Sequence, residues 1–115
     1  MKDFPEFMRN SKNRVDPKDQ KTQDIVGYFF EGADGTQMAF WTCYSDRTSL
    51  VHSHEFDEYL VCVDGEYTLI IGDEETVLNP GDEFVITKHT PHSGKCIAGT
   101  RTIHAFGGKR IQRTF

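Results

Sequence analysis

Apolar and polar residues alternate in short runs along most of this chain. From residue 24 onward the runs are rich in β-branched and aromatic residues, and turn-forming pairs such as Asp-Gly separate them. A period of two places successive side chains on opposite faces of a strand. The pattern therefore predicts a series of short strands, at residues 25–30, 38–44, 48–54, 59–63, 67–71, 76–78, 83–87, 92–97 and 100–106.

Many short strands at close spacing, with no convincing helical period, are typical of an all-β sandwich or barrel. The alternation places Leu60 and Cys62 on the same inner face as Glu58. Three side chains of the first two strands are expected to line the mouth of such a barrel, although aromatic strand faces more often form core: Tyr28, Met38 and Phe40.

Residues 1–21 differ from the rest of the chain. They are polar, contain Pro5 and Pro17, and show neither a helical nor a strand period. We interpret them as an N-terminal arm that precedes one domain at residues 22–115. The arm packs on its own domain, crosses to a partner subunit or stays disordered, and the sequence does not choose among these. Its candidate anchors are Phe4, Phe7 and Met8.

Composition narrows the classes of partner. A chain of 115 residues is one domain, and its net charge of -5 argues against nucleic acid as the main partner. No apolar run approaches the roughly 20 residues that span a bilayer, so we expect no membrane association. The first residues lack the apolar core of a signal peptide, and we expect a cytoplasmic protein.

Cysteine usage predicts no disulfide framework. The chain has three cysteines and no CxxC pair. We expect Cys43, Cys62 and Cys96 to be small buried apolar residues. Cys62 is the best candidate if any of the three is a reactive thiol.

Candidate chemistry gathers at residues 52–58, His-Ser-His-Glu-Phe-Asp-Glu. On a strand His52 and His54 point to the same side as a chelating pair, and a short turn can bring Glu58 to them. His92 follows a Pro-Gly-Asp turn by about ten residues, enough chain in a small antiparallel barrel to return beside the strand of His52. Imidazoles and one carboxylate are common ligands of divalent transition metals. A His-x-His pair alone would more often be a pair of solvated surface residues.

These residues resemble the two motifs of the cupin family. In the first motif, His52, His54, Glu58 and Gly65 match at the expected spacings, whereas Asp46 replaces the initial glycine. In the second motif, Gly81 and His92 match, and three positions differ: Thr87, His89 and Cys96. The resemblance covers about residues 36–106. It implies a small antiparallel β-barrel, or jelly roll, at residues 22–115.

The resemblance also implies a metal site made of His52, His54, Glu58 and His92. Such sites hold iron, manganese, nickel, zinc, copper or cobalt, and four protein ligands leave open positions for water or a ligand. His104 is either a base or substrate contact, or simply a histidine packed inside the barrel. His89 is expected to be exposed, and Asp57 and Glu55 either face solvent or orient a ligand histidine.

Three functions stay open at this level. The favoured one is a metal-dependent enzyme of dioxygenase, isomerase, epimerase or decarboxylase type that acts on a small oxygenated metabolite, with an anionic ligand among the options. The alternative is a non-catalytic module that binds or senses a small molecule. A structural storage protein is disfavoured by the short chain and the intact ligand set. The resemblance also predicts a homodimer.

Overall fold

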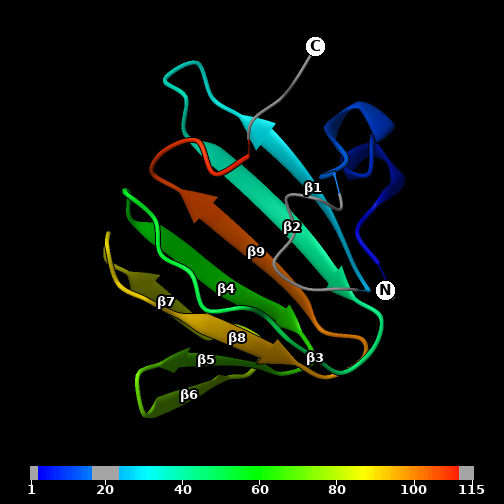
Figure 1. The fold of residues 1–115 in the computed structure, drawn as a ribbon. Coiled ribbons are helices and arrows are strands. Elements are labelled where there is room, and N and C mark those ends of the chain that lie inside the picture. Colours follow the sequence, from blue (N-terminus) through cyan, green and yellow to red (C-terminus); the bar gives the residue numbers. More distant parts are fainter. Residues whose placement is uncertain (1–2, 17–23, 112–115) are drawn as a thin grey trace.

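The computed structural model describes residues 3–16 and 24–111. In these ranges nine strands form two antiparallel sheets, and two short 3₁₀ helices, η1 (Glu6–Met8) and η2 (Ser11–Asn13), lie beside the first strand (Figure 1). The strands are β1 (Ile25–Glu31), β2 (Gln37–Cys43), β3 (Arg47–Thr48), β4 (Glu58–Asp64), β5 (Tyr67–Ile71), β6 (Glu74–Leu78), β7 (Glu83–Ile86), β8 (Ser93–Cys96) and β9 (Arg101–Phe106).

One sheet has five strands in the order β1-β2-β9-β4-β7, and the other has four in the order β3-β8-β5-β6. The all-β prediction is confirmed, and two packed antiparallel sheets are consistent with a jelly roll. Glycines make several of the tight connections. Gly65, between β4 and β5, has a φ of 78°, and an added Cβ would lie 2.7 Å from the Thr100 backbone, so this turn requires glycine.

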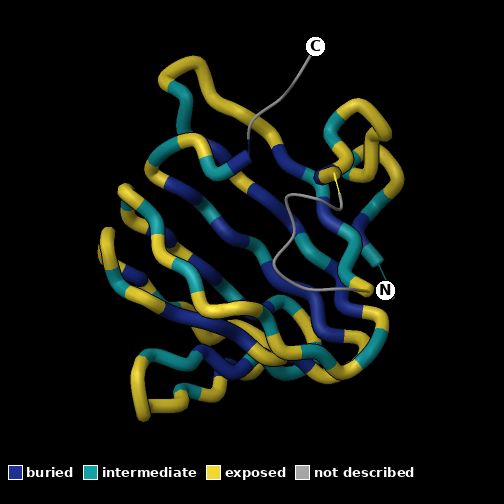
Figure 2. The backbone as a smooth tube through the Cα atoms, in the orientation of Figure 1, coloured by how far each residue is buried: buried dark blue, intermediate teal, exposed yellow. Residues whose placement is uncertain are grey.

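Most buried residues lie in the strands, and most residues in the turns are exposed (Figure 2). Two apolar clusters form the core. One contains Val15, Phe29, Ala39, Phe106 and Ile111. The other joins the two sheets and contains Leu60, Cys62, Leu69, Leu78 and Ile86. Cys62 is therefore a packed core residue on the face predicted for it, and burial raises the pKa of its thiol.

The strand predicted at residues 48–54 is shorter than expected. Thr48 pairs with Lys95, whereas His52 pairs with His92. The chain therefore advances four residues from Thr48 to His52 while its partner advances three, from His92 to Lys95. Between them the Gly94 N–H bonds to the Ser49 side chain at 2.8 Å instead of continuing the ladder. An extra residue of this kind ends regular pairing and redirects the chain.

The described part of the N-terminal arm, residues 3–16, packs on β1 and β2. Phe4 and Val15 are buried, and the Phe4 and Phe40 ring centroids are 5.5 Å apart. The expectation that Phe7 is an anchor is wrong, because its side chain is 80% exposed. The predicted boundary between residues 21 and 22 lies outside the described residues, and the domain division stays a prediction.

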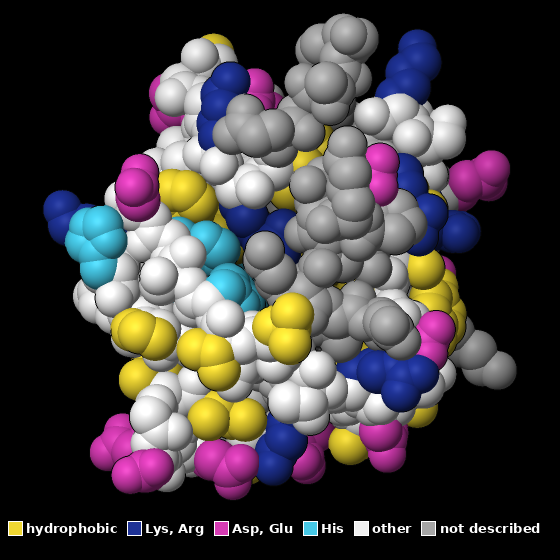
Figure 3. All heavy atoms as spheres, in the orientation of Figure 1, with side chains coloured by type: hydrophobic (Ala, Val, Ile, Leu, Met, Phe, Trp, Pro, Cys, Tyr) yellow, Lys and Arg dark blue, Asp and Glu magenta, His cyan; other side chains and the backbone are white. Residues whose placement is uncertain are grey.

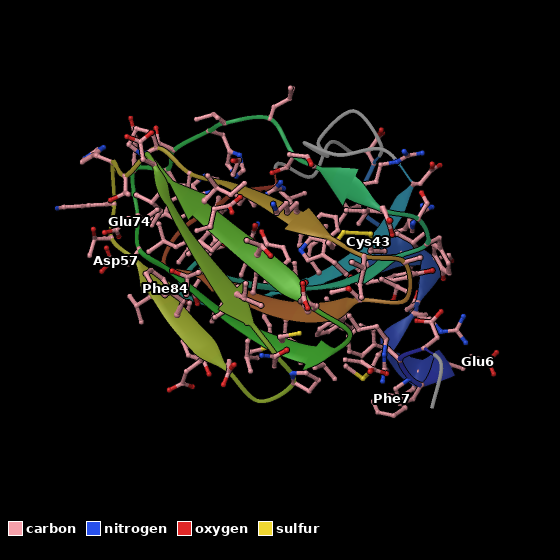
Figure 4. All side chains as sticks on the ribbon, turned by 90° about the horizontal axis from the view of Figure 1, so that it is seen from below. Glu6, Phe7, Cys43, Asp57, Glu74 and Phe84 are labelled. Atoms are coloured by element: carbon pink, nitrogen blue, oxygen red, sulfur yellow. A yellow bond between two sulfur atoms is a disulfide. The ribbon has the colours of Figure 1, made fainter. Side chains whose placement is uncertain are left out.

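The expectation of three separate cysteines is also wrong. Cys43 of β2 and Cys96 of β8 form a disulfide that joins the two sheets (Figure 4). They are 53 positions apart in the chain, yet their Cα atoms are 6.8 Å apart, because the fold brings the ends of these two strands together. The sequence has no CxxC spacing that would have indicated this pair.

None of the described helices is long and apolar enough to cross a membrane.

Candidate metal centre

A single antiparallel bridge brings His52 and His92 together. Their backbones exchange two hydrogen bonds, of 2.9 Å and 2.8 Å, and their ring centroids are 4.4 Å apart. The predicted return of His92 to the side of His52 is therefore present in the fold. The bridge directly follows the extra residue between β3 and His52, so the local irregularity sets which residues face each other.

Backbone carbonyls orient both of these imidazoles. His52 Nδ1 lies 2.8 Å from the Leu50 carbonyl oxygen, and His92 Nδ1 lies 2.8 Å from that of Thr90. A carbonyl oxygen only accepts, so Nδ1–H must donate in each case. In the neutral form the lone pair is then on Nε2, the atom available to a metal.

His54 completes a group of three histidines. Its ring stacks on Phe56 at a centroid distance of 5.1 Å and an interplanar angle of 7°. Ring nitrogens of His52, His54 and His92 all lie within 4.8 Å of one another. The separation of two residues between His52 and His54 thus does place them on one side, although the chain there is not a regular strand.

Glu58, the first residue of β4, brings a carboxylate to this group. Its Oε1 lies 3.3 Å from His54 Nε2 and 3.6 Å from His92 Nε2. Its Oε2 accepts a hydrogen bond of 2.7 Å from His104 Nδ1. The two oxygens therefore have different surroundings, one facing the histidine cluster and one held by β9.

The donor atoms fit a common ion. In the described residues, His54 Nε2, His92 Nε2 and Glu58 Oε1 are buried and have no hydrogen-bond partner, an arrangement that costs free energy unless another group satisfies them. Two ligands about 2.1 Å from one tetrahedral ion are about 3.4 Å apart, and Glu58 Oε1 lies 3.3 Å from His54 Nε2 and 3.6 Å from His92 Nε2. The three histidines could therefore hold a metal ion, and the Glu58 carboxylate lies next to two of them.

Burial and mutual contacts set the charges of these groups. Burial lowers the pKa of His52 to about 4. Burial alone would raise the pKa of Glu58, but the hydrogen bond from His104 and the neighbouring His54 and His92 imidazoles hold it well below its usual range. Burial would lower the pKa of His92, yet the adjacent Glu58 raises it. An ionised carboxylate beside a neutral His52 is the state that binds a cation.

His104 is buried in β9, and each of its two ring nitrogens contacts a polar side chain. Beyond its bond to Glu58, its Nε2 lies 3.0 Å from the Thr102 hydroxyl. If Nδ1–H donates to the carboxylate, Nε2 of the neutral ring accepts from Thr102. The geometry makes His104 a residue that orients Glu58, and a catalytic role for it stays a prediction.

The other polar candidates lie away from the cluster. His89 is exposed, as predicted, in a turn where its φ is 65°. Asp57 is exposed and accepts a hydrogen bond of 2.9 Å from the Lys88 backbone N–H. It therefore stabilises the turn before His92.

A cavity of about 80 Å³ lies beside the histidines, between the two sheets. The expectation that Tyr28, Met38 and Phe40 line it is wrong, because β2 presents the opposite set of residues. Trp41 and Cys43 face the cavity, whereas Met38 lies on the outer face and Phe40 is covered by Phe4. Alternation separates the two faces of a strand without saying which is inner.

Sequence reasoning missed several further residues of this cavity, among them Trp41, Tyr67 and Arg110. Trp41 was detectable, since it shares a strand face with Ala39 and Cys43. Tyr67 begins β5, and its ring centroid is 5.9 Å from that of His104. Arg110 follows the last strand, in a segment without periodicity, and only the folded chain reveals its place.

Comparison with known proteins identifies the family of this fold. A family model, the cupin domain, matches residues 41–110, so the chain belongs to the cupin family. A comparison with curated proteins found no match.

Several solved structures are similar. An RmlC-like cupin from Shewanella frigidimarina has a TM-score of 0.71 at 19% identity, over 90% of this chain and 86% of the other. KdgF from a Halomonas species has a TM-score of 0.66 at 20% identity, over 80% and 89%. The polyketide cyclase RemF from Streptomyces resistomycificus has a TM-score of 0.68 at 16% identity, over 81% and 71%. At these identities the likeness concerns the fold.

Proposed function

We propose that this cupin is a mononuclear metal-dependent enzyme that acts on a small oxygenated metabolite, by dioxygenase, isomerase or decarboxylase chemistry. The observation that carries the proposal is the set of buried donor atoms without a hydrogen-bond partner in the described residues, His54 Nε2, His92 Nε2 and Glu58 Oε1, beside an open cavity. His52, His54, His92 and Glu58 are the proposed ligands. We also propose that the protein is cytoplasmic.

A divalent ion held there would supply Lewis-acid or redox chemistry to oxygen atoms of a bound molecule. The protein contributes the rest. Carbonyls fix the His52 and His92 rings, and His104 fixes the carboxylate of Glu58. Trp41 and Phe106 border the cavity and give part of its wall an apolar surface. The metal is iron, manganese, nickel, zinc, copper or cobalt, since one ligand set serves all six.

A second candidate function is a non-catalytic module that binds or senses a small molecule. The observation in its favour is that both ring nitrogens of His104, the proposed base, already contact protein groups, Glu58 and Thr102. A histidine engaged on both sides is better suited to holding Glu58 than to moving a substrate proton. The metal site is common to both functions.

Elemental analysis of protein purified without added metal tests the proposal. We expect about one transition-metal ion per chain in the wild type. His54→Ala should lose the metal, because the variant lacks one buried donor atom, the Nε2 that lies 3.3 Å from Glu58 Oε1. His104→Phe should weaken metal affinity about 10- to 100-fold through loss of the contact to Glu58.

The matched control is His89→Asn, which removes an exposed histidine outside the cluster. It should retain the metal content of the wild type, and circular dichroism should show all variants folded. A wild type that contains no transition metal and takes up none on addition, or a His54→Ala variant that binds as much as the wild type, would contradict the proposal.

A further inference from the structure

Tyr67 of β5 reaches into the cavity over a glycine of the neighbouring strand. In the register of the four-stranded sheet, Tyr67 faces Cys96 of β8. Its hydroxyl lies instead over Gly94, two residues nearer to His92, because a Cβ added to Gly94 would be 1.9 Å from the Tyr67 oxygen and 2.3 Å from its Cζ. The phenol therefore leans along β8 towards His92, and a larger residue at position 94 would have to displace it.

Contacts hold the Tyr67 ring in place but leave its hydroxyl unpaired. The ring meets that of His104 edge to face, with centroids 5.9 Å apart, and packs against the core cluster that joins the two sheets. The nearby Thr102 hydroxyl is already 3.0 Å from His104 Nε2. Among the described residues, none forms a hydrogen bond with the Tyr67 hydroxyl. A phenol keeps its proton in neutral solution, so Tyr67 presents an O–H donor to the cavity that it lines.

The histidine cluster is accessible from one face of the molecule. Figure 3 shows histidine side chains next to one another on this face, with apolar side chains beside them. His52 and His54 are partly exposed, whereas His92 is buried. A small molecule that enters here meets the proposed metal ligands and the Tyr67 phenol in the same cavity. A divalent ion binds oxygen atoms with lone pairs, and a phenol donates to the same kind of atom.

We propose that Tyr67 positions the ligand of this cavity by donating a hydrogen bond to an oxyanion, a carboxylate or an enolate, that binds the metal. The inference rests on the proposed metal site. It makes Tyr67 a residue that contacts the ligand without contacting the metal, and it makes Gly94 the residue that admits the phenol. An O–H donor bound to a negatively charged oxygen forms one of the stronger hydrogen bonds in proteins, so this contact fixes how the ligand lies.

Titration of cobalt-loaded protein with acetate and with thiocyanate tests the inference. Both anions carry one negative charge, but the free sulfur of a nitrogen-bound thiocyanate is only a weak hydrogen-bond acceptor. Binding is measured from the visible spectrum of the cobalt. Tyr67→Phe should keep the cobalt content of the wild type and weaken acetate about tenfold or more, as expected for the loss of one hydrogen bond to a charged group. Its affinity for thiocyanate should stay close to that of the wild type.

Gly94→Ala is a second test, because it keeps the Tyr67 hydroxyl but takes the space that the hydroxyl occupies. It should weaken acetate as Tyr67→Phe does. The double variant should show little further loss, since both changes remove the same contact. An acetate affinity of Gly94→Ala equal to that of the wild type would contradict the role given to Gly94 and Tyr67.

The matched control is Tyr44→Phe, which removes a hydroxyl that donates to Asp3 at 3.0 Å on an exposed side chain. It should bind both anions as the wild type does, and thermal unfolding should show that every variant is folded. Cobalt uptake with equal acetate affinity in wild type and Tyr67→Phe, or an equal loss for acetate and thiocyanate, would overturn this inference alone. No cobalt uptake by the wild type would overturn the proposed metal site and the inference with it.

Discussion

At the scale of single residues, burial keeps His52 neutral where an exposed histidine would be partly charged. Its pKa falls to about 4, whereas a histidine in the unfolded chain has a value near 6.5. Its Nδ1–H is committed to the Leu50 carbonyl, so the neutral ring offers Nε2 in mildly acidic solution. The same shift links the folding of the metal-free protein to pH.

Because the folded-state pKa of His52 lies below the unfolded value, the unfolded chain binds the proton first as the pH falls. We predict that the metal-free protein loses stability from pH 6.5 towards 4.5, by up to about 1.4 kcal/mol per pH unit. His92 contributes in the opposite sense, but above pH 6.5, because its pKa is raised. Glu58, whose pKa is lowered, contributes mainly below its ordinary value of 4.5.

Chemical denaturation of chelator-treated protein at several pH values would measure this slope. His52→Asn should flatten it between pH 6.5 and 4.5, whereas His89→Asn, a change at an exposed position, should not. An unchanged slope in His52→Asn would show that another group controls the acid sensitivity.

Sequence reasoning found the cluster because its members are tied to short spacings. His52 and His54 share a side of an extended chain, and one turn brings Glu58 to them. His92 follows the Pro-Gly-Asp turn by about ten residues, and the resemblance to the cupin motifs implied that it is a ligand. Arg110 could not be found in this way, because its place depends on the Gln37 side chain, which holds Ile111 from a strand more than seventy residues earlier.

At the scale of elements, the Cys43–Cys96 disulfide cross-links the two sheets at one wall of the cavity. It closes a loop across 53 positions of the chain. Closing a loop of this length restricts the unfolded chain, and removal of such a link costs about 2–4 kcal/mol in the usual range.

We therefore predict that reductant lowers the thermal unfolding temperature of the oxidised wild type. Cys43→Ser should show the same lower temperature with and without reductant, since it has no link to lose. Peptide mapping under non-reducing conditions should recover residues 43 and 96 in one linked fragment. An oxidised wild type as sensitive to heat as Cys43→Ser would mean that the link does not stabilise the fold.

The strands were predictable where turns delimit them. The Asp-Gly and Pro-Gly-Asp sequences lie in turns between observed strands. The glycines of two of these turns, Gly65 and Gly81, have positive φ. The strand at residues 48–54 could not be predicted in full, because its register slips by one residue against β8 through the Ser49 side chain. The inner face of β2 also stayed ambiguous, since the N-terminal arm covers Phe40 and so buries an outer position.

At the scale of the whole molecule, an uncharged row crosses the outer face of the five-stranded sheet. The five residues of the row are direct cross-strand partners from β1 to β7. Four of them have large, exposed side chains: Phe30 (41% exposed), Met38 (46%), Tyr59 (36%) and Val85 (58%). In strand order β1-β2-β9-β4-β7 the row is Phe30, Met38, Ala105, Tyr59 and Val85. Contiguous exposed apolar surface of this kind favours association.

A second copy of the chain is the partner that we propose for this row. Copies that each carry a net charge of -5 repel each other, and an uncharged face is where they can approach most closely. We predict a homodimer at micromolar concentration, measured by size-exclusion chromatography with light scattering.

Two-fold symmetry sets the same surface against itself, so Met38→Glu introduces two carboxylates into one interface and should give a monomer. Val77→Glu, at an exposed position of the other sheet, should leave the dimer intact. A monomeric wild type would contradict the dimer, and an unchanged dimer in Met38→Glu would place its interface on another face.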